Sequence, residues 1–258
     1  WFMDEYGMMN GHTPGIVTGK PIELGGSLGR EAATGRGTAI ITRESASFFN
    51  LDLSKSNVVI QGFGNVGSYT AKFLDEMGSK IIAVSDVNGG LYEPDGFDVT
   101  SLIEFNSKNR TIKGCGQGSA ISNEKLIGLE CDFLIPAALG GVIHKMNVDE
   151  LNCKVVVEAA NGPVTPTADK KLFEKNIHVV PDILTNAGGV TVSYFEWVQN
   201  LQQLQWDESE VNEKLEKKMV SAFKEVSSLM EQRKTSMRMA AFAVAIDRVA
   251  QAYALRGI

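Results

Sequence analysis

Three glycines near position 65 have the spacing that a dinucleotide-binding turn requires. The stretch 57–61 predicts a short apolar strand, which leads directly into this turn and then into a helical pattern. The turn reads Gly62-Phe63-Gly64-Asn65-Val66-Gly67. Gly62 allows a sharp bend, Gly64 lets the backbone approach a pyrophosphate because it has no Cβ, and Gly67 allows close packing of helix on strand. Since a helix N-terminus also attracts phosphate, this order predicts a dinucleotide-binding βαβ unit rather than a structural glycine turn.

The residues that follow the glycines support this prediction. Apolar side chains recur at helical spacing from Val66 to Met77, and Gly78 is placed to end that helix. A second predicted strand, residues 80–86, ends in Asp86. Folds of this kind place the carboxylate that binds the adenosine ribose about 20 residues after the glycine motif.

Asp86 also bears on the choice of cofactor. Its carboxylate would accept a hydrogen bond from a ribose 2′-hydroxyl and repel a 2′-phosphate, and residues 87–90 contain no Arg or Lys. We therefore expect NAD rather than NADP. The alternative is that Asp86 only caps the turn that contains Asn88 and Gly89.

Three later segments repeat one arrangement, in which an apolar strand leads into a turn of small residues. The strands span 131–136, 154–158 and 177–182, and the turns span 137–141, 159–163 and 185–189. Continuous apolar strands that alternate with helices predict a parallel sheet covered on both faces, a Rossmann-like, doubly wound α/β fold. Ligands bind beyond the carboxyl ends of such strands, where all of these turns would meet. The alternative is that the turns are only tight connections.

The two ends of the chain differ from this central part. Residues 11–37 are rich in glycine, which indicates a backbone that passes close to another group, and residues 33–51 read as a helix. Residues 208–232 and 236–255 carry helical apolar stripes without strands. We expect them to form a helical appendage that either packs back on the sheet or reaches towards another domain.

Composition excludes several classes of function. The chain has 258 residues with 43% hydrophobic and 22% charged residues, as is ordinary for a globular protein. A net charge of −6 leaves no basic footprint for nucleic acid, and no apolar run reaches the length of a membrane span. We therefore expect neither a nucleic-acid partner nor a membrane. The chain begins at Trp1 without an initiator methionine and reads there like the interior of a helix, so we expect it to derive from a longer protein.

The cysteines and histidines look structural. The three cysteines are widely spaced, and the three histidines lack metal-ligand spacing, so no metal is expected. Reduced cysteines are typical of an intracellular protein, and we expect a cytoplasmic location, with a mitochondrial one as the alternative. Cys131 and Cys153 lie in apolar runs and are expected in the core.

Several longer motifs, spread over essentially the whole chain, resemble the C-terminal, cofactor-binding part of the glutamate dehydrogenases, within the Glu/Leu/Phe/Val dehydrogenase family. They are Gly19-Lys20-Pro21, residues 24–37, the glycine turn 62–67, Ile135–Ala138, Glu158–Pro163, Asn186–Ser193 and the ending 245–257. The resemblance implies a cofactor site and the roles of its residues. Arg30 and Thr34 match residues that approach the nicotinamide amide, and Asn65 matches the asparagine at the start of the phosphate-binding helix. The cofactor residues expected are Arg30, Thr34, Gly62, Phe63, Gly64, Asn65, Val66, Asp86, Ala137, Ala138, Asn161 and Asn186.

The resemblance further implies a substrate and an assembly. Ser193 matches a serine that hydrogen-bonds the side-chain carboxylate of the substrate, and Val190 lines the same pocket. The reaction would be NAD-dependent oxidation of L-glutamate to 2-oxoglutarate and ammonia, in a homohexamer with a cleft between two domains. The alternatives are a Leu/Phe/Val-type dehydrogenase, which the hydroxyl of Ser193 disfavours, and a non-catalytic NAD-binding module.

The family's general base is a lysine of the N-terminal domain, assisted by an aspartate, and these 258 residues contain no counterpart of that region. We therefore expect no catalytic residue here, and NAD binding without turnover. The implied division is a linker helix over 1–18 from an N-terminal substrate domain, a cofactor domain over 19–200, and C-terminal helices over 201–258 that pack back towards the domain interface.

Overall fold

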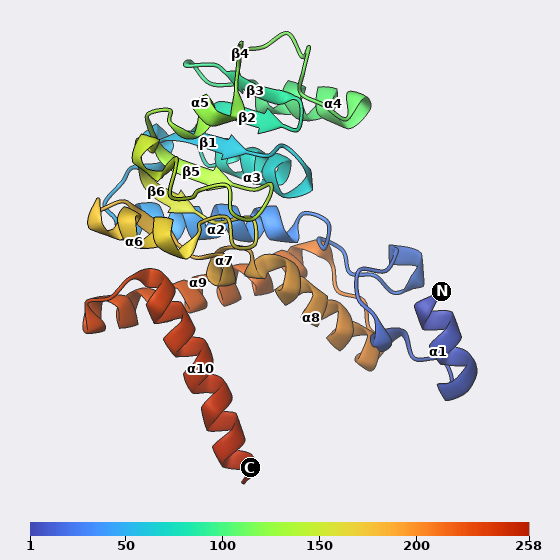
Figure 1. The fold of residues 1–258 in the computed structure, drawn as a ribbon. Helices are drawn as coiled ribbons and strands as arrows, with labels where there is room; N and C mark the ends of the chain where they lie inside the picture. Colours follow the sequence, from blue (N-terminus) through green and yellow to red (C-terminus); the bar gives the residue numbers. More distant parts are fainter. Residues whose placement is uncertain (258) are drawn as a thin grey trace.

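A seven-stranded sheet forms the centre of the protein in a computed structural model that describes residues 1–257 (Figure 1). The strands are β1 (Asn57–Gln61), β2 (Lys80–Asp86), β3 (Gly89–Tyr92), β4 (Ser119–Ile121), β5 (Cys131–Pro136), β6 (Cys153–Val157) and β7 (His178–Val180). Their order is β4-β3-β2-β1-β5-β6-β7. Strands β2, β1, β5, β6 and β7 are parallel, and β3 pairs antiparallel with both β2 and β4. The chain order reverses at β1, which lies between β2 and β5.

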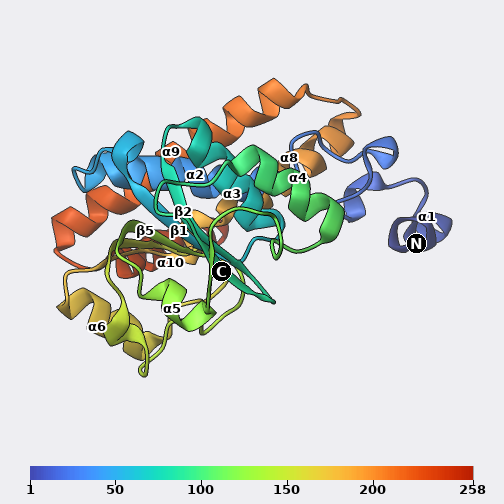
Figure 2. The same ribbon diagram turned by 90° about the horizontal axis from the view of Figure 1, so that it is seen from above.

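Helices precede, connect and follow the strands. They are α1 (Phe2–Asn10), α2 (Ala33–Phe48), α3 (Asn65–Glu76), α4 (Val99–Asn109), α5 (Asn123–Ile127), α6 (Pro166–Glu174), α7 (Asp182–Thr185), α8 (Ala187–Gln202), α9 (Glu208–Arg233) and α10 (Met237–Arg256). Short 3₁₀ turns lie at Pro14–Ile16, Ile22–Leu24, Leu53–Lys55 and Val148–Glu150. Figure 2 shows α2, α3 and α4 on one side of the strands and α5 and α6 on the other. The prediction of a doubly wound, mainly parallel sheet with helices on both faces is therefore confirmed.

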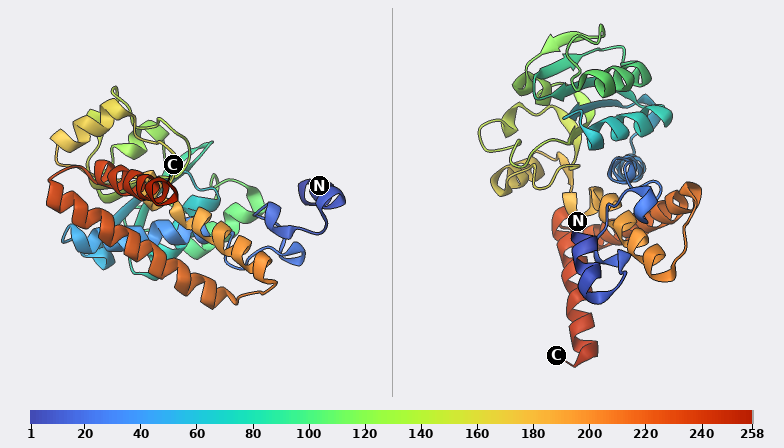
Figure 3. Two further views of the ribbon diagram at one scale, coloured as in Figure 1. Left: turned by 90° about the horizontal axis from the view of Figure 1, so that it is seen from below. Right: turned by 90° about the vertical axis from the view of Figure 1, so that its right-hand side faces the viewer.

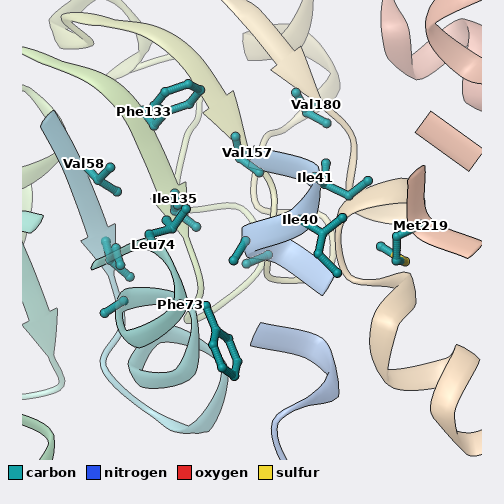
Figure 4. Packing of buried hydrophobic residues seen from close by; sticks show 14 of the residues in the cluster. Ile40, Ile41, Val58, Phe73, Leu74, Phe133, Ile135, Val157, Val180 and Met219 are labelled. Atoms are coloured by element: carbon teal, nitrogen blue, oxygen red, sulfur yellow. The ribbon is translucent and has the colours of Figure 1, made fainter. Parts of the chain in front are cut away.

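Alternate strand residues supply the cores on the two faces. Val58 and Ile60 of β1 belong to one buried cluster, together with residues of α2, α3, α8 and α9, whereas Val59 belongs to a second cluster with residues of α5 and α6. Figure 4 shows part of the first cluster, where strand side chains meet Ile40 and Ile41 of α2. Successive strand side chains point to opposite faces, so an uninterrupted apolar strand buries both faces of the sheet.

The glycine-rich N-terminal region makes the close approaches that its composition predicts. Gly35 and Gly37 lie within α2, and a Cβ on Gly35 would lie 2.5 Å from the Cβ of Tyr69 in α3. A Cβ on Gly37 would lie 2.9 Å from the Cα of Gly188 in α8. The missing side chains therefore let α2 cross both neighbouring helices in close contact.

The two C-terminal helices use their apolar stripes differently. Helix α9 buries its stripe, including Val211, Leu215 and Met219, against the layer that contains α2 and α8. Helix α10 buries only residues near its start, and Figure 3 shows the rest of it projecting away from the sheet. The sequence left open whether these helices pack back on the sheet or reach beyond it. Helix α9 packs back onto the sheet domain, and most of α10 extends beyond it.

The apolar patterns predict helices α2, α3, α9 and α10 and the five parallel strands, whereas the antiparallel pair β3 and β4 was not predicted. Cys131 and Cys153 are buried, as expected, and are register partners on β5 and β6. No helix in the described part of the chain, residues 1–257, is long and apolar enough to cross a membrane.

Candidate functional site at the carboxyl edge of the sheet

The turns that follow β1, β5, β6 and β7 lie side by side, and we call them the carboxyl edge. The Ala137 N–H donates to the Gln61 carbonyl at 2.7 Å, and the Ala159 N–H donates to the Pro136 carbonyl at 3.1 Å. The Glu158 N–H donates in the same way to the Val180 carbonyl at 3.1 Å. The small-residue turns therefore meet at one edge, as the repeated strand pattern predicts, and the order of strands reverses there at β1 and β5, where such sheets bind ligands.

Each of the three motif glycines meets a different steric demand. Gly62 has φ +97°, and a Cβ on it would lie 2.8 Å from the Cβ of Ala138. A Cβ on Gly67 would lie 1.8 Å from the Gly62 carbonyl oxygen. Gly64 differs from both, because a Cβ there would meet no atom of this chain within 4 Å. Gly62 and Gly67 therefore serve the fold, whereas the space in front of Gly64 is open to a ligand.

Helix α3 begins at this open position without a side-chain cap. Its N-cap is Gly64, and its first turn contains no acidic residue. Helices α4 and α5, in contrast, are capped by Asp98 and Ser122. The Asn65 side chain does not cap the helix and donates from Nδ2 to the Glu31 carbonyl at 2.9 Å. The N-terminus of α3 thus keeps its N–H groups and partial positive charge available for an anion such as a phosphate.

Asp86 ends β2 and is held by its own chain. Its Oδ2 accepts hydrogen bonds from the Thr111 hydroxyl at 2.6 Å and the Ile112 N–H at 2.9 Å, and its Oδ1 accepts one from the Asn88 N–H at 2.7 Å. Burial by itself would raise the pKa of Asp86, but these hydrogen bonds hold the pKa below its ordinary value. Asp86 thus accepts a capping hydrogen bond within its turn from the Asn88 N–H, and the ribose role of this ionised carboxylate stays a prediction.

A second group of predicted residues meets where α2 begins and α8 crosses it. Arg30 Nε donates to Ser193 Oγ at 2.9 Å. A Cβ on Gly189 of α8 would lie 2.4 Å from Thr34 Oγ1. The expected nicotinamide side, at Arg30 and Thr34, and the expected substrate side, at Ser193, therefore touch directly. Ser193 Oγ accepts from Arg30, so its own O–H remains able to donate to a carboxylate.

Asn186 connects this group to the turn after β6. Its Nδ2 donates to Asn161 Oδ1 at 2.7 Å and to the Ala159 carbonyl at 3.4 Å. The exposure of two other predicted residues differs. The Phe63 side chain is buried in the core, so only its backbone can face a cofactor, whereas Val190 on α8 is 70% exposed.

The structure also contains a buried ion pair that the sequence patterns do not predict. Lys20 Nζ lies 2.6 Å from Glu196 Oε1, with the Glu196 side chain fully buried and that of Lys20 5% exposed. Glu196 also accepts hydrogen bonds from the N–H groups of Gly19 at 2.9 Å and Lys20 at 3.3 Å. The pair fastens the segment before α2 to α8, the helix that carries Ser193. No local pattern joins positions so far apart, although Gly19-Lys20-Pro21 is one of the motifs noted above.

Within residues 1–257, no three His, Cys, Asp or Glu side chains are grouped as a metal site. The chemistry that the carboxyl edge and the neighbouring predicted residues offer is binding. The edge supplies an open glycine backbone, a helix N-terminus without a side-chain cap and the polar groups of Asn161 and Asn186; Arg30, Ser193 and the ionised carboxylate of Asp86 lie on adjoining segments. This set fits the phosphates, ribose and carboxamide of a dinucleotide.

Comparisons with known proteins agree with this description. The family model for glutamate/leucine/phenylalanine/valine dehydrogenase matches residues 25–257. A glutamate dehydrogenase from Thermotoga maritima is 52% identical over 260 residues, covering 100% of this chain and 62% of the relative. A cryptic catabolic NAD-specific glutamate dehydrogenase from Bacillus subtilis is 45% identical, covering 100% of this chain and 60% of the relative.

A solved structure is similar as well. The crystal structure of a hetero-hexameric glutamate dehydrogenase from Thermus thermophilus in its Leu-bound form superimposes with a TM-score of 0.93 at 36% identity, covering 100% of this chain and 61% of that one. The chain thus spans about 60% of the length of the relatives that it matches.

Proposed function

Since the chain belongs to the glutamate/leucine/phenylalanine/valine dehydrogenase family, we propose that it is the cofactor-binding part of an NAD-dependent glutamate dehydrogenase. The observation that carries the proposal is the open backbone at Gly64, in front of the N-terminus of α3. The complete enzyme would oxidise L-glutamate to 2-oxoglutarate and release ammonia. The named activities of the relatives support this choice of substrate.

The residues of this chain would bind and orient the cofactor. The backbone at Gly64 and the first N–H groups of α3 would hold the pyrophosphate, and the Asp86 carboxylate would favour NAD by repelling a 2′-phosphate. Arg30, Thr34 and Asn186 would fix which face of the nicotinamide meets the substrate. The bound nicotinamide would supply the hydride acceptor, while the protein supplies orientation and exclusion of water.

Replacing Gly64 with alanine tests cofactor binding with little effect on the fold. Alanine is a poorer N-cap than glycine, but it restricts the unfolded chain, so we expect the free energy of unfolding to change by less than about 1 kcal/mol. The new Cβ would occupy the space in front of the pyrophosphate, so NADH affinity should fall by about tenfold or more, equivalent to about 1.4 kcal/mol. Fluorescence titration of the 258-residue chain with NADH measures this change.

The same titration with NADPH tests the assignment of Asp86, because the unmodified chain should bind NADH more tightly than NADPH. An unchanged NADH affinity in the Gly64→Ala variant would contradict the site. Glutamate oxidation, assayed on the same sample, is expected to be undetectable, since the family's general-base lysine has no counterpart in these 258 residues.

Replacing Ser193 with alanine in the full-length enzyme tests the substrate assignment. The hydroxyl would donate to the side-chain carboxylate of glutamate, a hydrogen bond to a charged group worth about 1.5–3 kcal/mol. We expect kcat/KM for glutamate to fall by about tenfold or more, as that free energy implies. Norvaline lacks the carboxylate and is the internal control, so an equal loss for both substrates would count against this role of Ser193.

Three further proposals concern the assembly, the location and the domain division. We propose a homohexamer for the full-length enzyme, supported by the hetero-hexameric Thermus enzyme. We propose a cytoplasmic location, supported by the buried thiols of Cys131 and Cys153. We also propose the division into 1–18, 19–200 and 201–258, with α8 crossing the second boundary because it ends at Gln202.

A further inference from the structure

Arg238 lies outside the carboxyl edge but holds a buried carboxylate directly behind it. Arg238 is in the first turn of α10, and its Nη1 and Nη2 donate to Glu158 Oε2 and Oε1 at 2.9 and 2.8 Å. Glu158 follows β6 and is fully buried. Two parallel N–H···O bonds fix the orientation of a carboxylate as well as its position.

The oriented Glu158 carboxylate in turn holds the start of α7. The Asp182 N–H donates to Glu158 Oε2 at 2.8 Å. The side chain of Asp182 then accepts a hydrogen bond at Oδ2 from the Gly162 N–H at 2.7 Å. Contacts therefore run without a break from α10 to the turn after β6.

Helix α7 carries a site contact at each of its ends. It spans only Asp182–Thr185, so Asn186 follows directly, and Asn186 Nδ2 donates to Asn161 Oδ1 at 2.7 Å. Asp182 holds Gly162 at one end, and Asn186 holds Asn161 at the other. Fixing the start of this single turn therefore fixes the two asparagines relative to each other.

Arg238 also supplies the positive charge for a cluster of three carboxyl groups, those of Glu158, Asp169 and Asp182. It lies 3.0 Å from Asp169 Oδ1 and 3.8 Å from Asp182 Oδ1, in addition to its contacts with Glu158. Burial raises the pKa of the Glu158 carboxyl, and the hydrogen bonds and charge of Arg238 oppose that rise. Without the guanidinium, three carboxyl groups would face one another in a largely buried space.

We propose that Arg238 is a positioning residue for the nicotinamide side of the cofactor site, acting through Glu158 and Asp182 on Asn161 and Asn186. The proposal rests on the proposed function, in which Asn186 orients the nicotinamide, and Asn161 is the hydrogen-bond partner of Asn186. Under this proposal, the first turn of α10 affects how the cofactor is aligned, although no residue of α10 is among the expected cofactor contacts.

The test compares NADH with ADP-ribose, which lacks only the nicotinamide ring. Arg238→Lys keeps the positive charge but cannot form two parallel bonds to Glu158. NADH affinity of the 258-residue chain should then fall by about tenfold, whereas affinity for ADP-ribose should change by less than about twofold, because only the ring side is misaligned. NADH is titrated by its fluorescence and ADP-ribose by competition. The matched control is Arg248→Met on the same helix, which removes a 61% exposed partner of Glu225 and should change neither affinity.

The possible outcomes separate positioning from a merely structural role. An equal loss for NADH and ADP-ribose would show general loosening and overturn the proposal, as would two unchanged affinities. If Arg238→Lys does not fold, Glu158→Gln applies the same test, with selective loss of NADH affinity expected. If the unmodified chain binds neither ligand, the proposed function fails and the inference fails with it, whereas selective loss of NADH affinity supports both.

Discussion

Replacing Gly67 with alanine is expected to destabilise the protein by about 3 kcal/mol, the upper end of the usual cost of overpacking. Helix propensity alone predicts the opposite sign, because alanine is better than glycine in a helix by about 1 kcal/mol. The steric conflict decides the outcome, since the new Cβ would lie 1.8 Å from the Gly62 carbonyl oxygen and 3.0 Å from the Gly62 carbonyl carbon. Both are backbone atoms, so α3 would have to move away from β1.

Chemical denaturation of Gly67→Ala measures this loss, and Gly64→Ala is the matched control from the same turn. The control adds the same methyl group in open space and should retain its stability. Gly67→Ala should also bind NADH more weakly, because displacement of α3 moves its N-terminus away from the phosphates. Equal stability of the two variants would mean that the close approach of α3 to β1 is not required.

Replacing Lys20 with methionine is expected to cost about 3 kcal/mol of stability, because it leaves the fully buried Glu196 carboxylate without its cation. The carboxylate would retain the hydrogen bonds from the N–H groups of Gly19 and Lys20, which places the loss at the lower end of about 3–5 kcal/mol for breaking a buried pair. The segment before α2 would loosen from α8 at the same time.

A double-mutant cycle with Glu196→Gln separates the interaction energy of the ion pair from the effect of each single substitution on stability. The double variant should regain much of the lost stability, since no unpaired charge remains buried. Lys55→Met is the control, because its pair with Asp52 is 3.0 Å long but both side chains are largely exposed, and its loss should stay below about 1 kcal/mol. Urea unfolding of the four variants provides the free energies, and a loss for Lys20→Met as small as that of Lys55→Met would refute a stabilising role for the buried pair.

Local spacing explains why the phosphate-binding turn and its flanking elements could be predicted. The strand, the turn and the helix that contain Gly62, Gly64 and Gly67 are consecutive in sequence. The local backbone requires glycine at the start of this turn, as the φ of +97° at Gly62 shows. The apolar strands are likewise visible because burial on both faces removes polar residues from the whole segment.

The antiparallel pair at the edge of the sheet could not be predicted in this way. Strands β3 and β4 are only four and three residues long, and β4 follows β3 after α4. Their pairing depends on β2 being in place beside β3. Short strands with partners supplied from a distance carry little periodicity of their own.

The α/β fold, the glycine turn at Gly62–Gly67 and the acidic residue Asp86 at a strand end could be predicted from backbone conformation and short-range patterns, whereas Asn161 and Asn186 were expected only from the family resemblance. The pairing of Lys20 with Glu196, the pairing of Arg238 with Glu158 and the contact of Arg30 with Ser193 could be seen only in the folded protein. The physical reason is that a buried charge needs a partner close in space, and folding brings that partner from any distance along the chain.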